Sequence, residues 1–129
     1  MTFAPEAPAE RGDSFEVSVS RHDGIDVVTA SGDLDLTTAV KLRHVLFDPV
    51  LCSQPVVVVD LNAVSFLDST GIGTLVAGRR WTASRGARFV LVCDEGRALK
   101  VLKIVRLNMV MQIWPTLDVV LDELGRARG

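Results

Sequence analysis

The residue types best suited to chemistry lie together in one short segment, Asp68-Ser69-Thr70-Gly71-Ile72-Gly73, which follows a strongly apolar stretch. Asp, Ser and Thr are favoured where helices begin, because their side-chain oxygens accept hydrogen bonds from the N–H groups of the first turn. Asp68 is therefore predicted to cap a helix and to leave the hydroxyl groups of Ser69 and Thr70 at its exposed N-terminal end. Two interpretations stay open at this point: these residues only cap the helix, or they present a hydroxyl group to a partner.

Two glycines, Gly71 and Gly73, lie within the first turn of the same predicted helix. Each costs about 0.5–1 kcal/mol relative to alanine inside a helix, so we expect something to approach the backbone there. The neighbour could be a partner protein, the sheet beneath the helix, or a phosphate group, whose charge the helix dipole would favour. No GxxxxGK[ST] pattern and no nearby lysine accompany the turn, so a P-loop and nucleotide hydrolysis are disfavoured.

Acidic side chains form a second candidate group. Asp33, Asp35 and Asp60 could act as an acid pair or as ligands of magnesium. Asp60 ends an apolar run, however, and its simplest role is to accept a hydrogen bond from the loop that follows, so a structural role is favoured. The enzymatic alternative is a metal-dependent phosphate site built from Asp33, Asp35 and Asp68.

The histidines and cysteines favour neither a metal site nor a disulfide. His22 lies in a predicted turn and His44 on a predicted helix, and their separation matches no metal-ligand spacing. Cys52 and Cys93 each border or lie within an apolar segment, so both are expected to be buried thiols. No metal and no cofactor are therefore expected.

The segments that must position these groups begin with a predicted pair of antiparallel strands. Phe15, Val17 and Val19 alternate with polar residues, which is the period of a half-buried strand. Residues 22–24 (HDG) favour a turn, and a second apolar run follows over Ile25–Ala30.

Helical and strand patterns then alternate to the end of the chain. From Thr37 the apolar residues recur every three or four positions, which predicts a helix that ends near Pro49. Val56–Leu61 is a β-branched run without alternation, typical of a central strand covered on both faces. The remaining expected elements are a helix after Asp68 stopped by Gly86, a strand over Phe89–Cys93, a helix capped by Asp94, a strand over Val110–Trp114, and a helix from Pro115-Thr116 to Leu124.

This β-β-α-β-α-β-α-β-α order predicts the α/β fold class, with a single domain in which about four helices cover a mixed sheet of about five strands. We assign residues 14–124 to this domain. Residues 1–13 lack any periodicity and contain two prolines, so they are expected to form a flexible tail, as are residues 125–129.

Size and composition exclude several classes of protein. A chain of 129 residues with 48% hydrophobic and 23% charged residues fits one globular domain. The formal charge of −2 and the scattered arginines give no electrostatic footprint for nucleic acid. The apolar runs are far shorter than a membrane span, and the N-terminus does not look like a secretory signal, so no membrane contact and a cytoplasmic location are expected.

Two motifs together carry a resemblance to a known family. The DSTGIG segment after an apolar strand, combined with Gly32-Asp33-Leu34-Asp35 after the second strand, resembles the STAS domain, and in particular its stand-alone anti-sigma factor antagonists. The likeness extends over about residues 14–124 in the element order given above.

The resemblance implies a partner-switching protein that regulates transcription and is not an enzyme. In that family the serine after the aspartate is phosphorylated by an anti-sigma factor that is itself a serine kinase, and by position this acceptor would be Ser69. Asp68 would orient the loop, and Thr70, Gly71, Ile72 and Gly73 would belong to the docking surface. Asp35 would lie beside the acceptor on the partner-binding face, and a serine phosphatase would reverse the modification.

An alternative within the same fold is a scaffold or accessory subunit of a stressosome-like or lipid-transport complex. Such a subunit would share the domain without the sigma-factor circuit. Thr70 offers a second hydroxyl beside Ser69, so the choice of acceptor rests on family position. The acceptor oxygen must be accessible, because a buried hydroxyl could not reach a kinase.

Overall fold

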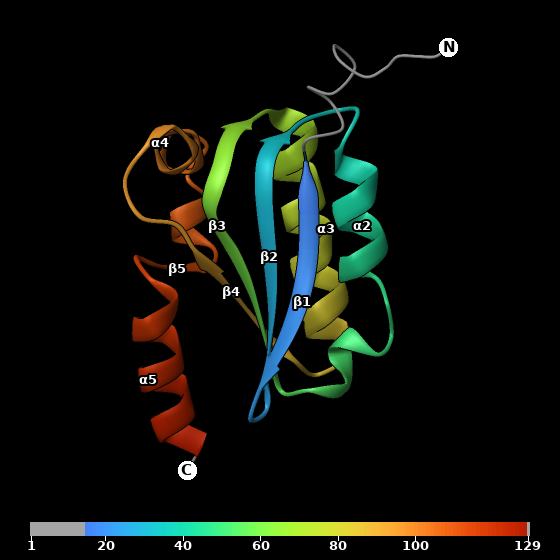
Figure 1. Ribbon diagram of the computed structural model, residues 1–129, viewed down its shortest axis with the longest axis vertical. Coiled ribbons are helices and arrows are strands. Elements are labelled where there is room, and N and C mark those ends of the chain that lie inside the picture. The colour runs from blue at the N-terminus through green and yellow to red at the C-terminus, as the bar shows by residue number, and fades with distance from the viewer. Residues whose placement is uncertain (1–14, 129) are drawn as a thin grey trace, which may run out of the picture.

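Five strands form one mixed sheet in the computed structural model, which describes residues 15–128 except the side chains of Cys52 and residues 125–128. The strands lie side by side in chain order, β1-β2-β3-β4-β5 (Figure 1). β1 is antiparallel to β2, and the other neighbours are parallel, as the predicted mixed sheet requires. Their bounds are β1 Glu16–His22, β2 Ile25–Leu34, β3 Val56–Leu67, β4 Arg88–Val92 and β5 Gln112–Trp114.

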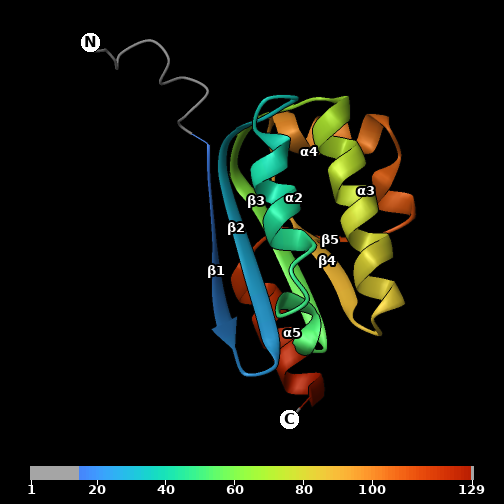
Figure 2. The same ribbon diagram turned by 90° about the vertical axis from the view of Figure 1, so that its right-hand side faces the viewer.

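Among the described residues, four helices cover the two faces of the sheet; three of them are crossovers between parallel strands, and the fourth follows the last strand. The helices are α2 Ala39–Leu46, α3 Ser69–Ser84, α4 Arg97–Ile104 and α5 Leu117–Arg128. Buried residues of α2, α3 and α4 join one core cluster, whereas α5 packs on the opposite face (Figure 2). The predicted antiparallel pair and the predicted central position of β3 are both confirmed.

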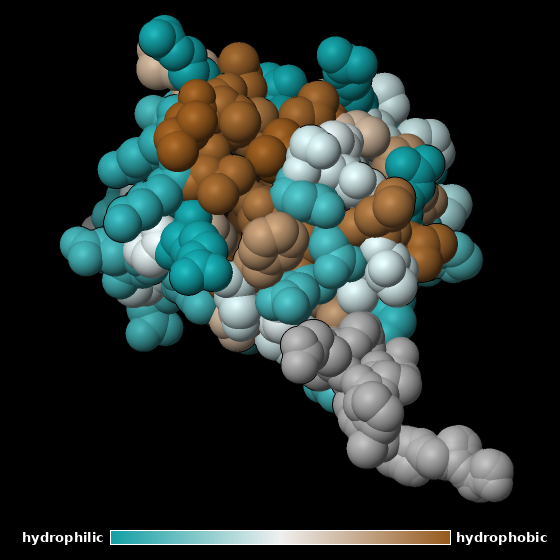
Figure 3. Space-filling view, turned by 90° about the horizontal axis from the view of Figure 1, so that it is seen from above, coloured by the Kyte–Doolittle hydropathy of each residue, from teal (hydrophilic) through white to brown (hydrophobic). Residues whose placement is uncertain are grey.

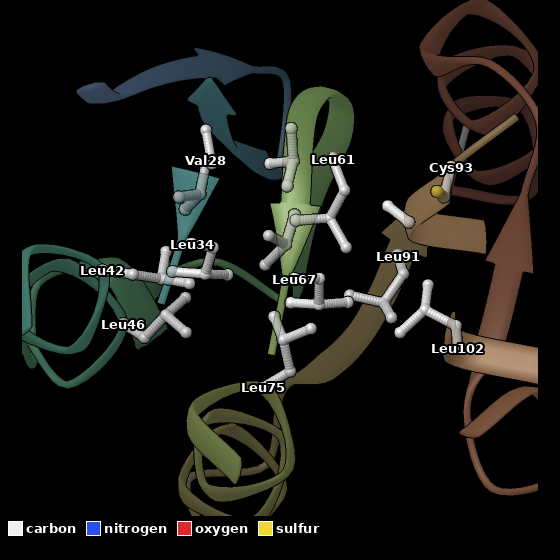
Figure 4. Packing of buried hydrophobic residues seen from close by; sticks show 14 of the residues in the cluster. Val28, Leu34, Leu42, Leu46, Leu61, Leu67, Leu75, Leu91, Cys93 and Leu102 are labelled. Atoms are coloured by element: carbon white, nitrogen blue, oxygen red, sulfur yellow. The ribbon is translucent and has the colours of Figure 1, made fainter. Parts of the chain in front are cut away.

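The larger core lies between the sheet and the α2–α3–α4 layer. Leu42 and Leu46 of α2 meet Leu34 of β2, while Leu75 of α3 points toward the middle of the sheet (Figure 4). The smaller core, under α5, joins Val120 and other α5 residues to valines of β2, β3 and β4. Burial of β3 on both faces accounts for its unbroken run of valines.

The strands β2 and β3 are longer than the sequence predicts. Gly32, Asp33 and Leu34, expected after the end of the second strand, continue β2, and residues 62–67, expected in a loop, continue β3. The two extensions pair with each other, with register shifts between Thr29 and Ser31 and between Gly32 and Asp33. Cross-strand pairing thus stabilises segments whose own composition does not indicate strand.

Several helix and strand ends also differ from the predictions. Helix α2 ends at Leu46, before Pro49, and Val50 is exposed because it lies beyond the helix. Strand β5 begins at Gln112, two residues late, since residues 107–109 form a 3₁₀ turn. Helix α5 continues past Gly125 to Arg128, so the predicted end of the helix is wrong. The predicted tail over residues 1–13 lies outside the described residues.

The expected cap of α4 is another error. Asp94 makes no side-chain cap; the N-cap residue is Gly96, whose φ of 126° favours glycine. Gly86, in contrast, follows the last turn of α3 with φ 82°, which confirms it as the residue at which that helix stops.

Candidate functional site

Asp68 caps helix α3 as the sequence predicts. Its Oδ1 accepts a hydrogen bond from the Gly71 N–H at 3.0 Å, and its backbone carbonyl accepts from the Ile72 N–H at 3.0 Å. The extended backbone at Asp68 turns the chain from the end of β3 directly into the helix. The carboxylate is therefore held against the first turn, and the hydroxyl residues follow it at once.

Ser69 is exposed, whereas Thr70 is half-buried. The Thr70 carbonyl accepts from the hydroxyl of Thr74, one turn further along α3, at 3.0 Å. The two hydroxyl residues therefore differ in accessibility, a difference that the sequence does not reveal. The requirement for an accessible acceptor is met at Ser69.

Asp35 orders the turn that joins β2 to α2. Its Oδ1 accepts from the backbone N–H groups of Thr37 at 3.0 Å and Thr38 at 3.1 Å. The buried hydroxyl of Thr38 donates to the Asp33 carbonyl at 2.6 Å and accepts from the Asp35 N–H at 3.0 Å. Sequence reasoning missed Thr38, although an Asp followed three residues later by Thr is a recognisable turn pattern.

Parallel pairing brings Asp35 and Asp68 to the same edge of the sheet. Leu34 and Leu67 are register partners at the ends of β2 and β3. Asp35 is the residue after Leu34, and Asp68 is the residue after Leu67. The Asp68 N–H also donates to the Leu34 carbonyl at 3.3 Å. The register of the sheet thus places Asp35 and Asp68, and with Asp68 the following Ser69, at one edge.

The two glycines of the α3 turn have different surroundings. A Cβ on Gly71 would lie 2.8 Å from a Leu67 methyl, 2.9 Å from Leu34 Cγ and 3.0 Å from the Leu34 carbonyl, so glycine is needed for close packing of the helix on the sheet. A Cβ on Gly73 would meet nothing within 4 Å. Close contact with the sheet therefore accounts for the glycine at position 71, which is buried. Of the two glycines, only Gly73 is left open to an outside partner.

Large apolar side chains are exposed close to this edge. Leu36, next to Asp35, is 76% exposed, and Phe66, two residues before Asp68, is 41% exposed. Ile72 is half-buried against the larger core. Figure 3 looks down on this end of the molecule and shows a broad hydrophobic patch toward the α4 side, with a smaller group toward α2. Sequence reasoning missed Leu36 and Phe66, because neither stands out from the apolar residues beside it.

Asn62 is a further residue that the sequence does not single out. Its Oδ1 accepts from the Asp94 N–H at 2.6 Å, and its Nδ2 donates to the Pro115 carbonyl at 3.1 Å. Asp60 accepts from the Asn62 N–H at 3.0 Å, which agrees with the structural role predicted for this aspartate. One side chain on β3 therefore ties together the loops that follow β4 and β5.

Cys93 is a buried thiol that the sequence also singled out. Cys93 is buried as predicted, and burial, with smaller contributions from Asp60 and Asp94, raises the pKa of its thiol to about 11. The thiol is thus protonated near neutral pH and is a poor nucleophile. The Cys52 side chain lies outside the described part of the structure.

Among the side chains that the structure describes, no three His, Cys, Asp or Glu residues are grouped in a way that could hold a metal ion. His22 and His44 are both exposed. None of the helices in the described part of the chain is long and apolar enough to cross a bilayer.

Comparison with known proteins gives consistent matches over most of the chain. A family model described as the STAS domain matches residues 16–120. The anti-sigma-F factor antagonist RsfB of Mycobacterium tuberculosis is 29% identical over 117 residues, covering 91% of this chain and 93% of that protein. The anti-sigma-B factor antagonist of Listeria monocytogenes is 30% identical over 100 residues, covering 78% of this chain and 87% of that protein.

Solved structures agree with the sequence matches. An anti-sigma factor antagonist from Mycobacterium paratuberculosis superposes with a TM-score of 0.78 at 32% identity, covering 97% of this chain and 100% of that one. A putative anti-sigma factor antagonist from Thermotoga maritima, at 20% identity, has a TM-score of 0.72 over 88% of this chain and 97% of that one, which shows a shared fold.

Proposed function

This chain belongs to the STAS domain family, and we propose that it acts as an anti-sigma factor antagonist whose binding is switched off by phosphorylation of Ser69. In this function the unmodified protein captures an anti-sigma factor and so releases a sigma factor. The same anti-sigma factor serves as the serine kinase, and a serine phosphatase restores the binding form.

The observation that carries the proposal is the exposed Ser69 directly after the Asp68 cap. A kinase must bring its ATP γ-phosphate to the hydroxyl oxygen, which an exposed serine at a helix end permits. Thr70 is half-buried, which favours Ser69 as the acceptor. The names of the relatives, anti-sigma-F and anti-sigma-B factor antagonists, support the choice of partner class.

The surface around Ser69 suits a protein partner. Gly73 leaves the α3 backbone open to close approach, and Leu36 and Phe66 offer apolar area that is exposed to solvent in the free chain. Interfaces gain most of their free energy from such apolar anchors surrounded by polar groups. Asp35 and Asp68 supply the polar groups here.

Electrostatics explains how the modification would act as a switch. A phosphoserine carries a charge of about −1.5 to −2, and at a helix N-terminus that charge is tolerated by its own protein. A partner surface that fits a neutral hydroxyl next to Asp35 and Asp68 would instead meet repulsion and an unpaired, desolvated charge. A penalty of about 2.7 kcal/mol would weaken binding about a hundredfold, enough for regulation.

The test requires the full chain, an anti-sigma factor kinase from the same cell and ATP. We expect a mass gain of one phosphate that maps to Ser69, is lost in Ser69→Ala and is retained in Thr70→Val. Ser69→Asp should bind the kinase about a hundredfold more weakly than the unmodified chain, while Ser69→Ala should bind normally. Modification of Ser69→Ala at an undiminished level would refute the assignment of the acceptor, and equal binding by Ser69→Asp would refute the switch.

A further inference from the structure

Strand β1 lies at an open edge of the sheet. Among the described residues it pairs with one strand, β2, and no helix or strand lies beyond its other side (Figure 2). The pairing with β2 is regular from Glu16 to His22, with no register shift. The outer side of β1 is thus a straight row of backbone groups available for hydrogen bonding.

The turn after β1 determines which backbone groups point outward. Asp23 and Gly24 have positive φ values of 43° and 88° and form a two-residue turn between the paired residues His22 and Ile25. His22 and Ile25 are then a hydrogen-bonded pair, and in an antiparallel ladder such pairs alternate along the strand. The backbone N–H and C=O groups of Val17, Val19 and Arg21 therefore point away from β2.

The residue before β1 follows the same alternation. The Phe15 carbonyl accepts a hydrogen bond from Lys41 Nζ of α2, outside the sheet, at 3.4 Å. Phe15 lies two positions before Val17, and residues two positions apart in a strand direct their backbone groups to the same side, so the Phe15 carbonyl is expected on the outer side. An existing contact thus supports the assignment of outward groups.

The usual protection of an edge strand is missing from β1. Proteins commonly block such edges with proline, a bulge or several lysines, and residues 16–22 (EVSVSRH) contain none of these. Val19 is 47% exposed, and a groove of about 610 Å³ runs between β1 and α2, lined by Glu16, Val17, Val40, Lys41 and His44. The edge therefore combines free backbone groups with exposed apolar side chains.

We propose that β1 pairs antiparallel with β1 of a second copy of this chain, to form a symmetric dimer with one continuous sheet. Placing Val19 opposite Val19 of the second copy joins all the outward groups, because Val17 then faces Arg21 across the axis. Among antiparallel registers confined to residues 16–22, no other pairs every outward N–H and C=O group of Val17, Val19 and Arg21. The dimer leaves Ser69 outside the interface and does not depend on the proposed function.

The side chains are self-complementary in this register. Glu16 lies opposite His22, so a carboxylate meets an imidazole that can donate a hydrogen bond, twice in the dimer. The Arg21 stem packs beside Val17, and the two Val19 side chains meet at the axis. Neither Glu16 nor Arg21 lies opposite the same residue of the second copy, so this register places no two like charges opposite each other. Residues 16–22 therefore complement the same residues running in the opposite direction, which favours a second copy of this chain over an unrelated strand.

The experiment measures the molar mass of the full chain by sedimentation across a wide concentration range. We expect a concentration-dependent dimer. Val19→Pro should raise its dissociation constant about tenfold or more, because it removes an N–H at the axis of the interface. That N–H points away from β2, so thermal unfolding of the monomer should stay cooperative. Ser18→Pro is the matched control, since it removes an N–H that faces β2 and should destabilise the monomer itself.

A pair of exchanges tests the register. Glu16→His alone places two imidazoles together and should weaken the dimer, whereas Glu16→His combined with His22→Glu restores both pairs and should recover it. A chain that stays monomeric at every concentration would overturn the proposal and leave the edge to an extended segment of another protein or to residues 1–14. A dimer that survives Val19→Pro unchanged would also overturn it, because it would use another surface.

Discussion

The backbone carbonyl of Leu34 accepts a hydrogen bond from the N–H of Asp68 at 3.3 Å. This contact connects the end of β2 to the residue that caps α3, so the turn after β2 and the first turn of α3 are held as one unit. Asp35 and Ser69, which directly follow the two bonded residues, are thereby brought to the same edge.

Gly71 and Gly73 form a matched pair for testing the packing of α3. Gly71→Ala should lower the free energy of unfolding by about 1–3 kcal/mol, because its Cβ would press on Leu34 and Leu67. Gly73→Ala should leave stability unchanged or raise it by up to about 1 kcal/mol, since alanine favours the helix and the site is open. Urea unfolding of both variants checks this order; equal destabilisation would contradict it.

Two substitutions separate the capping role of the Asp68 side chain from the role of its charge. Asp68→Ala should cost about 1 kcal/mol of unfolding free energy, because the bond from Gly71 N–H is lost. Asp68→Asn should cost less, as an amide oxygen accepts the same bond. If the kinase recognises the carboxylate itself, Asp68→Asn should slow phosphorylation of Ser69 while thermal unfolding stays near that of the parent chain.

Phe66 is expected to act in binding and not in folding. Phe66→Ser should weaken capture of the anti-sigma factor about tenfold or more, with little change in unfolding, because the ring is 41% exposed in the free protein. Val50→Ser is a control, since Val50 is 64% exposed but follows α2, away from Ser69. Calorimetric titration of both variants with the anti-sigma factor checks this prediction. Weaker binding by Val50→Ser than by Phe66→Ser would contradict the assignment of Phe66 to the binding surface.

Cys93 should make stability depend on alkaline pH. Its folded pKa of about 11 lies above the unfolded value of 9.0, so the unfolded chain releases the thiol proton first as pH rises. The stabilisation is fully present below pH 9.0 and falls by about 2–3 kcal/mol as pH approaches 11. The chain contains no tyrosine, so no phenol titrates in the same pH range. Unfolding measured against pH should show a shallower fall in Cys93→Ala; identical slopes would exclude the thiol as the cause.

Local patterns in the sequence were sufficient for the element order and for the cap. Apolar periodicity depends only on residues a few positions apart, so it identified the first strand pair and the central β3. The Asp68 cap is equally local, because its acceptor and its donor are three residues apart. Asp94 shows the limit of that reasoning: a residue with the right type and position did not become the cap.

Long-range pairing decided the rest. The pairing of β2 with β3 extended both strands, placed Leu34 beside Leu67 and so brought Asp35 next to Asp68. The same packing separated two glycines that look alike in the sequence, burying Gly71 against the sheet and leaving Gly73 open. The sequence by itself determined the order of the strands and helices and the Asp68 cap, because those preferences are set by near neighbours. Which residues share the functional edge was decided only by the tertiary structure, because it depends on a register between residues about thirty positions apart.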